Sequence, residues 1–186
     1  DWMEGGFYYS DITGKEYGGG YLQSYKDKGF NVKFKLKDQD KYPAIALGFN
    51  DFAGTGIYSS EYLVSSYSLN NMNITLGLGW GNLAGSATFT NPFSQLSDNF
   101  LERQTSYGEG GDFNFGSYFA GEKSSLFGGL EYALNSKIKL KAEFDPTITP
   151  GLVGYEEKSS DINLGLEYAI TNNLVGSISY ERGNYL

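Results

Sequence analysis

Residues 137–144, Lys-Ile-Lys-Leu-Lys-Ala-Glu-Phe, alternate strictly between charged and apolar side chains. In an extended chain the apolar residues at 138, 140, 142 and 144 share one face, and the charged residues share the other. No helical period fits this spacing, because a helix brings together residues that are three and four apart. The stretch is therefore predicted to be a β-strand with one apolar and one polar face.

The same alternation recurs along the chain. Apolar residues occupy every second position in residues 30–36, 72–80 and 162–170. These runs, with weaker ones between them, predict about ten strands. The strands are placed near residues 4–10, 20–26, 29–37, 43–50, 57–67, 72–81, 124–134, 137–145, 160–170 and 174–183.

The connections between these runs are of two kinds. Residues 68–71, 134–136 and 171–173 are short and rich in Asn and Ser, which tolerate turn conformations. Residues 82–124 form one very long connection. Short turns at one end and long loops at the other are typical of outer-membrane barrels. We therefore predict an all-β fold, an antiparallel up-and-down transmembrane β-barrel of about ten strands with short periplasmic turns and long outer loops.

A soluble β-sandwich also has one apolar face per strand, so alternation alone leaves that fold open. In the barrel interpretation the polar faces line a narrow lumen, where opposite charges form a network. Its predicted members are Lys33, Lys35, Glu61, Glu131, Lys139, Lys141, Glu143, Glu167 and Glu181. A five-residue repeat, Gly-Leu-Glu-Tyr-Ala at 129–133 and 165–169, places Glu131 and Glu167 on one side of the sheet, two strands apart.

Composition excludes several functions. The formal net charge of −8 argues against nucleic acid as a partner, because phosphates call for a basic surface. The chain has no histidine and no cysteine, so it lacks the commonest general base and thiolate metal ligands. Glu131 and Glu167 meet the two-carboxylate requirement of a glycosidase, but acidic pairs are common in β proteins. We expect a protein that is not an enzyme and that has no cofactor and no metal.

Two regions offer candidate contacts to a glycan. One is the turn at 50–56, where Asp51 and Thr55 offer oxygens to a sugar hydroxyl; the other is the long connection with its many aromatic rings. The full set of candidates is Asp51, Thr55, Trp80, Arg103, Tyr107, Asp112 and Tyr118, with Arg103 expected to pair with an acidic saccharide. The alternative is structural: the turn only fixes its hairpin, and the rings pack the loop onto the barrel.

Residues 41–56, Lys-Tyr-Pro-Ala-Ile-Ala-Leu-Gly-Phe-Asn-Asp-Phe-Ala-Gly-Thr-Gly, precede Tyr-Ser-Ser-Glu-Tyr-Leu-Val at 58–64. This segment resembles a signature of the YjbH/GfcD family, outer-membrane β-barrel proteins tied to exopolysaccharide and capsule production. Further matches follow in the same order: 77–81, 91–93, Arg103, 110–111, Phe119, Gly121, 126–132 and 180–184. The ordered set spans residues 29–184.

The resemblance implies a place in the Gram-negative outer membrane and a role in the export or assembly of exopolysaccharide or capsule. The implied partners are outer-membrane lipid, a polysaccharide and periplasmic export proteins. Family members are considerably longer, so residues 1–186 are expected to be the N-terminal barrel portion, either a single domain or a fragment of a larger barrel. Two alternatives stay open: a glycan- or partner-binding module acting through loop 82–124, and a soluble β-sandwich carbohydrate-active protein.

Overall fold

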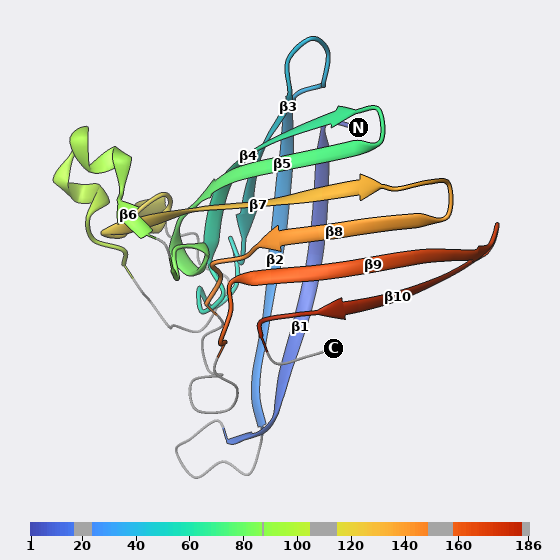
Figure 1. Ribbon diagram of the computed structural model, residues 1–186. Coiled ribbons are helices and arrows are strands. Elements are labelled where there is room, and N and C mark those ends of the chain that lie inside the picture. Colours follow the sequence, from blue (N-terminus) through green and yellow to red (C-terminus); the bar gives the residue numbers. More distant parts are fainter. Residues whose placement is uncertain (17–23, 87, 105–114, 149–157, 184–186) are drawn as a thin grey trace.

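A computed structural model describes residues 1–16, 24–86, 88–104, 115–148 and 158–183 (Figure 1). The strands are β1 (Met3–Glu16), β2 (Ser24–Lys37), β3 (Ala44–Asn50), β4 (Ser60–Leu69), β5 (Met72–Gly79), β6 (Thr88–Thr90), β7 (Lys123–Ala133), β8 (Ile138–Phe144), β9 (Ile162–Thr171) and β10 (Leu174–Tyr180). Four short 3₁₀ helices lie between β5 and β7: η1 (Gly81–Leu83), η2 (Pro92–Gln95), η3 (Asp98–Phe100) and η4 (Phe115–Ser117).

All ten strands belong to one antiparallel sheet, in the order β1-β2-β3-β4-β5-β7-β8-β9-β10, with β6 paired to β7 beside this path. The predicted all-β, up-and-down sheet of about ten strands is therefore confirmed. No pairing joins β1 to β10 in the described part of the chain. A sandwich needs two packed sheets, so the described residues do not form one. No helix among them is long and apolar enough to cross a membrane.

Two strand predictions were wrong in detail. Residues 24–26 of the first predicted run and the whole run predicted at 29–37 belong to one strand, β2, whose register with β1 is continuous from Phe34 to Tyr25; residues 20–23 lie outside the described residues. The gap left between the two predicted runs, at residues 27 and 28, lies within this strand. The short strand β6 and the 3₁₀ helices inside the long connection were not predicted, since three- and four-residue elements leave no period to detect.

Cross-strand rows alternate in character. One row joins Tyr67, Ile74, Leu130, Ala142, Leu164 and Tyr180 from β4 to β10. The neighbouring row joins Ser68, Asn73, Glu131, Lys141, Gly165 and Ser179. Successive side chains of a strand point to opposite faces, so the sheet has an apolar face that carries the first row and a polar face that carries the second.

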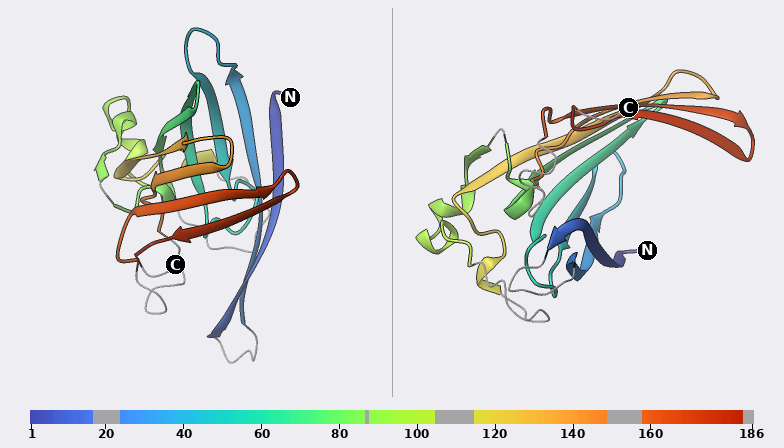
Figure 2. Two further views of the ribbon diagram at one scale, coloured as in Figure 1. Left: turned by 45° about the vertical axis from the view of Figure 1, so that its right-hand side comes forward. Right: turned by 90° about the horizontal axis from the view of Figure 1, so that it is seen from below.

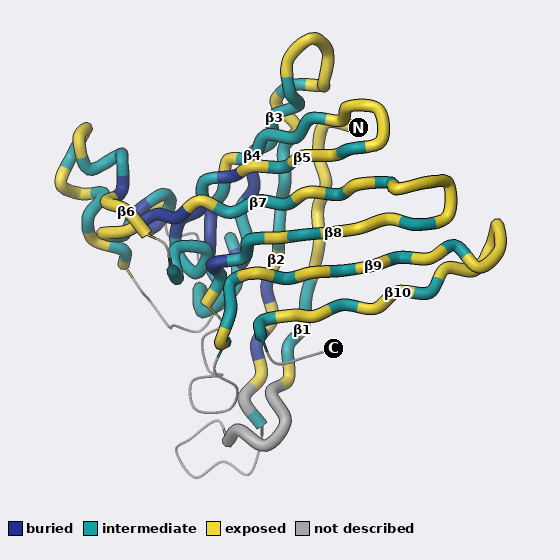
Figure 3. The backbone as a smooth tube through the Cα atoms, viewed as in Figure 1, coloured by how far each residue is buried: buried dark blue, intermediate teal, exposed yellow. Residues whose placement is uncertain are grey.

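The apolar face of β4–β10 is open to its surroundings, with large side chains 37–56% exposed. They are Leu63, Leu69, Ile74, Leu76, Leu126, Leu130, Tyr132, Leu140, Ile162, Leu164, Leu166, Tyr168, Ile170, Ile178 and Tyr180. Among the described residues the buried hydrophobic side chains are Trp80 and Ala120. Figure 3 shows that buried positions gather near the ends of β4, β5 and β7 next to the long connection. The sheet itself therefore has almost no hydrophobic core.

The three tight connections lie together at one end of the sheet (Figure 1). Asn70 adopts a left-handed φ of 49° between β4 and β5, and Asn135 Oδ1 accepts from the amides of Lys137 and Ile138 between β7 and β8. Residues 81–86, 88–104 and 115–122, the described part of the connection between β5 and β7, lie at the opposite end and are called the cap loop below. Figure 2 shows the sheet curling, with β1–β3 on one side and β8–β10 on the other.

Candidate functional site

A buried ion pair fastens the cap loop to the sheet. Glu61, at the start of β4, is 1% exposed, and its two carboxylate oxygens accept from Arg103 Nη1 and Nη2 at 2.9 and 2.8 Å. The guanidinium also donates to Ser59 Oγ and to the carbonyls of Ser117 and Ala120. Phe119 N donates to Glu61 Oε2 at 2.9 Å. This bidentate geometry is the strongest that Arg and carboxylate form.

A second buried contact lies beside it. Asn91 is fully buried, and its Oδ1 accepts from Trp80 Nε1 at 2.9 Å. Asn91 Nδ2 donates to the carbonyls of Phe100, Phe119 and Gly121, so this one amide joins both arms of the cap loop. The Trp80 ring stacks on Phe93, with centroids 5.4 Å apart, and meets Phe119 edge-on.

Both contacts lie on the apolar face of the sheet. Glu61 is opposite Phe49 and two residues from Leu63, and Trp80 is two residues from Leu78. The cap loop thus covers the apolar face at this end. The prediction that Glu61 belongs to the charge network of the polar face was therefore wrong: strict alternation puts it on the apolar face, where Arg103 from the cap loop compensates its charge.

Three predicted glycan contacts are used inside the protein in this structure. Trp80 is 2% exposed, the Arg103 side chain is 13% exposed and paired with Glu61, and Tyr118 Oη donates to the Phe52 carbonyl at 2.8 Å. Burial raises the pKa of the Tyr118 hydroxyl, and the Glu61 carboxylate adds to the rise. Tyr107 and Asp112 lie outside the described residues. The alternative, that cap-loop rings pack onto the sheet, describes what these residues do here.

The turn at 51–59 holds a different cluster. Asp51, with φ 53°, is 3% exposed, and its Oδ2 accepts from the Tyr58 amide at 3.2 Å. Thr55 Oγ1 donates to Asp27 Oδ1 at 2.8 Å, and Tyr8 Oη donates to Asp27 Oδ2 at 2.9 Å. Burial raises the pKa of Asp51 to about 6, and the nearby Asp27 carboxylate contributes to the rise. Asp51 and Thr55, predicted from the sequence, thus lie in one cluster with Asp27 and Tyr8.

Opposite charges line the polar face of β7, β8 and β9. Lys141 Nζ is 3.8 Å from Glu131 Oε2 and also pairs with Glu167, and Lys139 Nζ is 3.4 Å from Glu131 Oε1. The two repeated glutamates therefore share one lysine of the strand between them. Glu143 accepts from Asn163, and Glu181 accepts from Ser179. A pocket of about 430 Å³ opens among Asn73, Thr75, Glu131 and Lys141.

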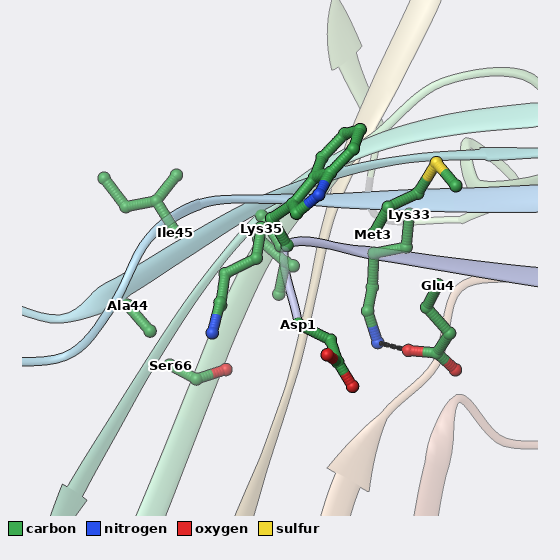
Figure 4. Close-up of a pocket in the computed structure, with 11 residues that line it drawn as sticks. Asp1, Met3, Glu4, Lys33, Lys35, Ala44, Ile45 and Ser66 are labelled. Carbon is green, nitrogen blue, oxygen red and sulfur yellow. Dashed lines mark ion pairs between the residues drawn. The ribbon is translucent and has the colours of Figure 1, made fainter.

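A second pocket, of about 480 Å³, lies at the β1–β4 side of the sheet (Figure 4). Its charged lining residues are Asp1, Glu4, Lys33 and Lys35, beside the apolar side chains of Ala44, Ile45 and Val64. Lys33 pairs with Glu4 at 2.5 Å and Lys35 pairs with Asp38 at 2.6 Å. These lysines, predicted as lumen charges, each have an acidic partner on a neighbouring segment, so the pocket presents little net charge.

A third pocket, of about 290 Å³, lies between the cap loop and the turn at 51–59. Its lining includes Ser59, Asn82, Arg103 and Lys123 together with backbone of Gly56, Gly81 and Gly121. The described residues bring no three Asp, Glu, Cys or His side chains together as a metal cluster.

Several residues of these sites were not predicted. Asn91 precedes Pro92 and caps η2 by accepting from the Phe93 amide, so the Asn-Pro pair was a usable signal for a helix start. Asp27 and Tyr8 gave no such signal. Tyr8 lies 19 residues before Asp27 and Thr55 lies 28 residues after it. These partners meet only because β1 pairs with β2 and because the turn at 51–59 packs against β2.

Comparisons with known proteins agree with the sequence resemblance. The family model YjbH, described as "Exopolysaccharide biosynthesis protein YbjH", matches residues 1–186. The chain is 35% identical over 190 residues to the "Uncharacterized lipoprotein YjbH" of Escherichia coli strain K12, covering 98% of this chain and 27% of that relative. The chain thus spans about a quarter of the relative's length. No solved structure matches. The match over the whole length shows that this chain belongs to the YjbH family of exopolysaccharide biosynthesis proteins.

Proposed function

We propose that this chain is a non-enzymatic outer-membrane component of exopolysaccharide or capsule export or assembly. In this proposal the sheet crosses the Gram-negative outer membrane as a β-barrel or as part of a larger one. The polar face turns toward the lumen, the three tight turns face the periplasm, and the cap loop faces outward. Its partners are outer-membrane lipid, a polysaccharide and periplasmic export proteins.

One observation carries the proposal: the exposed apolar face of β4–β10, which continues across every strand of that part of the sheet. Water-soluble proteins rarely leave an apolar surface of this extent uncovered. Lipid is the solvent that makes such a face favourable. The family description supplies the polysaccharide half of the proposal.

The sheet edges add a requirement. In a bilayer every backbone donor and acceptor needs a partner, so open sheet edges do not occur in the hydrocarbon region. β1 and β10 end the strand order in the described residues, so we expect each to pair in the membrane. They pair with each other, or with strands that correspond to the part of the longer relative outside the match.

The polar face supports a hydrophilic interior. Glu131, Lys139, Lys141 and Glu167 form a charge network that hydrocarbon would not accommodate but that water or a hydrated polymer would. A narrow barrel of ten strands is largely filled by such side chains. We therefore expect either an accessory, non-conducting role or a conduit widened by additional strands.

The test uses a strain that lacks the protein, complemented with wild type, Ile178→Lys or Ser177→Lys. These adjacent residues of β10 lie on the apolar and polar faces respectively. A lysine on the lipid face of a barrel costs about 2–4 kcal/mol near the bilayer centre. We expect wild type and Ser177→Lys to reach the outer-membrane fraction, to shift on unboiled gels and to restore released polysaccharide. Ile178→Lys should fail in all three.

Two results would contradict the proposal. Wild-type protein in the soluble fraction without a gel shift would remove the membrane location. Unchanged polysaccharide release in the strain without the protein would remove the export role while leaving the location intact.

A second candidate function is favoured by the 290 Å³ pocket at the base of the cap loop: an outer-membrane module that binds a glycan or a partner there. Lys123 has a side chain 46% exposed beside this pocket. Loss of glycan retention in Lys123→Ala, with unchanged polysaccharide release, would support this candidate over export.

A further inference from the structure

Two carboxylates at the cap-loop end of the sheet are buried without a cation. Asp27 is 4% exposed and Asp51 is 3% exposed, and no basic side chain of the described residues forms an ion pair with either. Glu61, the other buried carboxylate, has the Arg103 guanidinium as its partner. Burying charge without compensation is costly, so this pair calls for a positive partner.

The oxygens around these carboxylates are incompletely used. Asp51 Oδ1 is buried and has no hydrogen-bond partner, and the same holds for Tyr58 Oη. Such groups are rare in folded proteins, and each one calls for an explanation such as a bound ion or an ordered water. The Asp27 carboxylate accepts from two hydroxyls, of Thr55 and Tyr8. The Thr55 oxygen also accepts from the Ile57 amide at 3.3 Å, which leaves it one lone pair for another contact.

The backbone brings these oxygens together. A Cβ at Gly29 would overlap Asp51 Oδ1 and lie 2.7 Å from Tyr8 Oη, so glycine at this position leaves room for both groups. A Cβ at Gly54 would also overlap the Asp51 carboxylate. Asp51 itself holds the left-handed φ of 53°, fixed by its amide, which donates to Asn31 Oδ1 at 3.0 Å. Asp adopts this backbone more readily than most non-glycine residues, so the turn fixes where the Asp51 carboxylate lies.

We propose that this cluster binds a hard divalent cation of the calcium class, coordinated by the carboxylates of Asp27 and Asp51 and the hydroxyl of Thr55. All available donors are oxygens, which suit Ca²⁺ and give Zn²⁺ none of its preferred nitrogen or sulfur ligands. With two carboxylates rather than three or four, the affinity should be that of extracellular calcium modules, about 0.1–1 mM. The proposal does not rest on the proposed role in export.

A bound proton is the competing way to compensate the charge. One proton would neutralise only one of the two carboxylates and leave the other charged. A divalent cation compensates both carboxylates at once.

The test uses Tb³⁺ as a calcium probe, with the protein purified in detergent at pH 7. The rings of Tyr8 and Tyr58 stand edge to face, 5.9 Å apart, beside the cluster, where they can transfer excitation to a bound lanthanide. We expect sensitised Tb³⁺ emission that Ca²⁺ displaces with a midpoint in the millimolar range. Asp51→Asn and Asp27→Asn should each weaken the displaceable signal at least tenfold, while Glu122→Gln, an exposed acid at the same end, should leave it unchanged.

Folding is checked separately by the gel shift of unboiled protein, because asparagine tolerates the left-handed backbone at position 51. A folded wild type with no displaceable Tb³⁺ emission would overturn the proposal. So would a signal that both folded asparagine variants retain, because the probe would then lie elsewhere. Neither result bears on membrane location or on polysaccharide release.

Discussion

Arg103 and Glu61 are 42 positions apart in the sequence and meet through two hydrogen bonds, of 2.9 and 2.8 Å, beneath the cap loop. The same guanidinium reaches the carbonyls of Ser117 and Ala120. One side chain therefore links the start of β4 to both arms of the cap loop, which runs from the end of β5 at Gly79 to the start of β7 at Lys123.

Breaking this pair should be strongly destabilising. Glu61→Gln leaves the Arg103 charge buried without compensation, which costs about 3–5 kcal/mol. The measurement is urea unfolding followed by tryptophan fluorescence. Glu4→Gln, which breaks the exposed pair with Lys33, is the control and should cost less than about 1 kcal/mol. Equal losses in the two variants would mean that the Arg103 site is hydrated.

Asn91→Ala should loosen the cap loop more than the removal of one small side chain would suggest. The substitution leaves the Trp80 indole N–H and the carbonyls of Phe119 and Gly121 without their side-chain partner, at about 1–3 kcal/mol for each buried group left unsatisfied, whereas the Phe100 carbonyl keeps its bond from the Gly121 amide. In a Trp2→Phe background Trp80 is the remaining tryptophan. We expect its emission to move to longer wavelength as water enters. Unchanged emission would contradict the role given to Asn91.

Two glycines make room for aromatic rings on the polar face. A Cβ at Gly48 would overlap the Tyr62 ring, and a Cβ at Gly77 would overlap the Phe127 ring. These rings meet edge to face at 6.0 Å. Gly48→Ala and Gly77→Ala should each destabilise the fold by about 1–3 kcal/mol through overpacking. Gly5→Ala is the control and should leave the stability unchanged, because nothing lies within 4 Å of a Cβ at that position. The stability of each variant is read from the temperature at which the gel shift is lost.

The charge network of β7–β9 should be weak and sensitive to salt. The side chains of Lys141 and Glu131 are 47% and 29% exposed, so removing the lysine charge in Lys141→Met should cost less than about 1 kcal/mol. The cost should fall further in 1 M salt, because ions screen exposed pairs. A loss well above this, independent of salt, would show that the polar face is closed to water.

The sequence predicted the sheet well, because each strand carries its own alternation. Residues 137–144 predicted β8 at Ile138–Phe144 to within one residue, and the Asn- and Ser-rich turns predicted the hairpin ends. Glu61 was placed on the wrong face because a charge in a strand normally marks the polar side. Recognising the exception required Arg103, which lies 42 residues away in a loop without periodicity. Contacts of this separation leave no local trace in a single sequence.

Ile74 and Leu130 form an apolar cross-strand pair, and the next pair, Asn73 and Glu131, is polar, so the length of each strand decides which side chains face each environment. Inserting or deleting one residue within a strand exchanges the two environments for every residue beyond it, so the lysines and glutamates of the network would be moved among the leucines. Where no β-bulge takes up the extra residue, as one does in β2 between Lys35 and Lys37, strands here can lengthen only two residues at a time. Connections such as 38–43 and 51–59 are not subject to this rule. Natural length variation should therefore be confined to the connections or come in pairs.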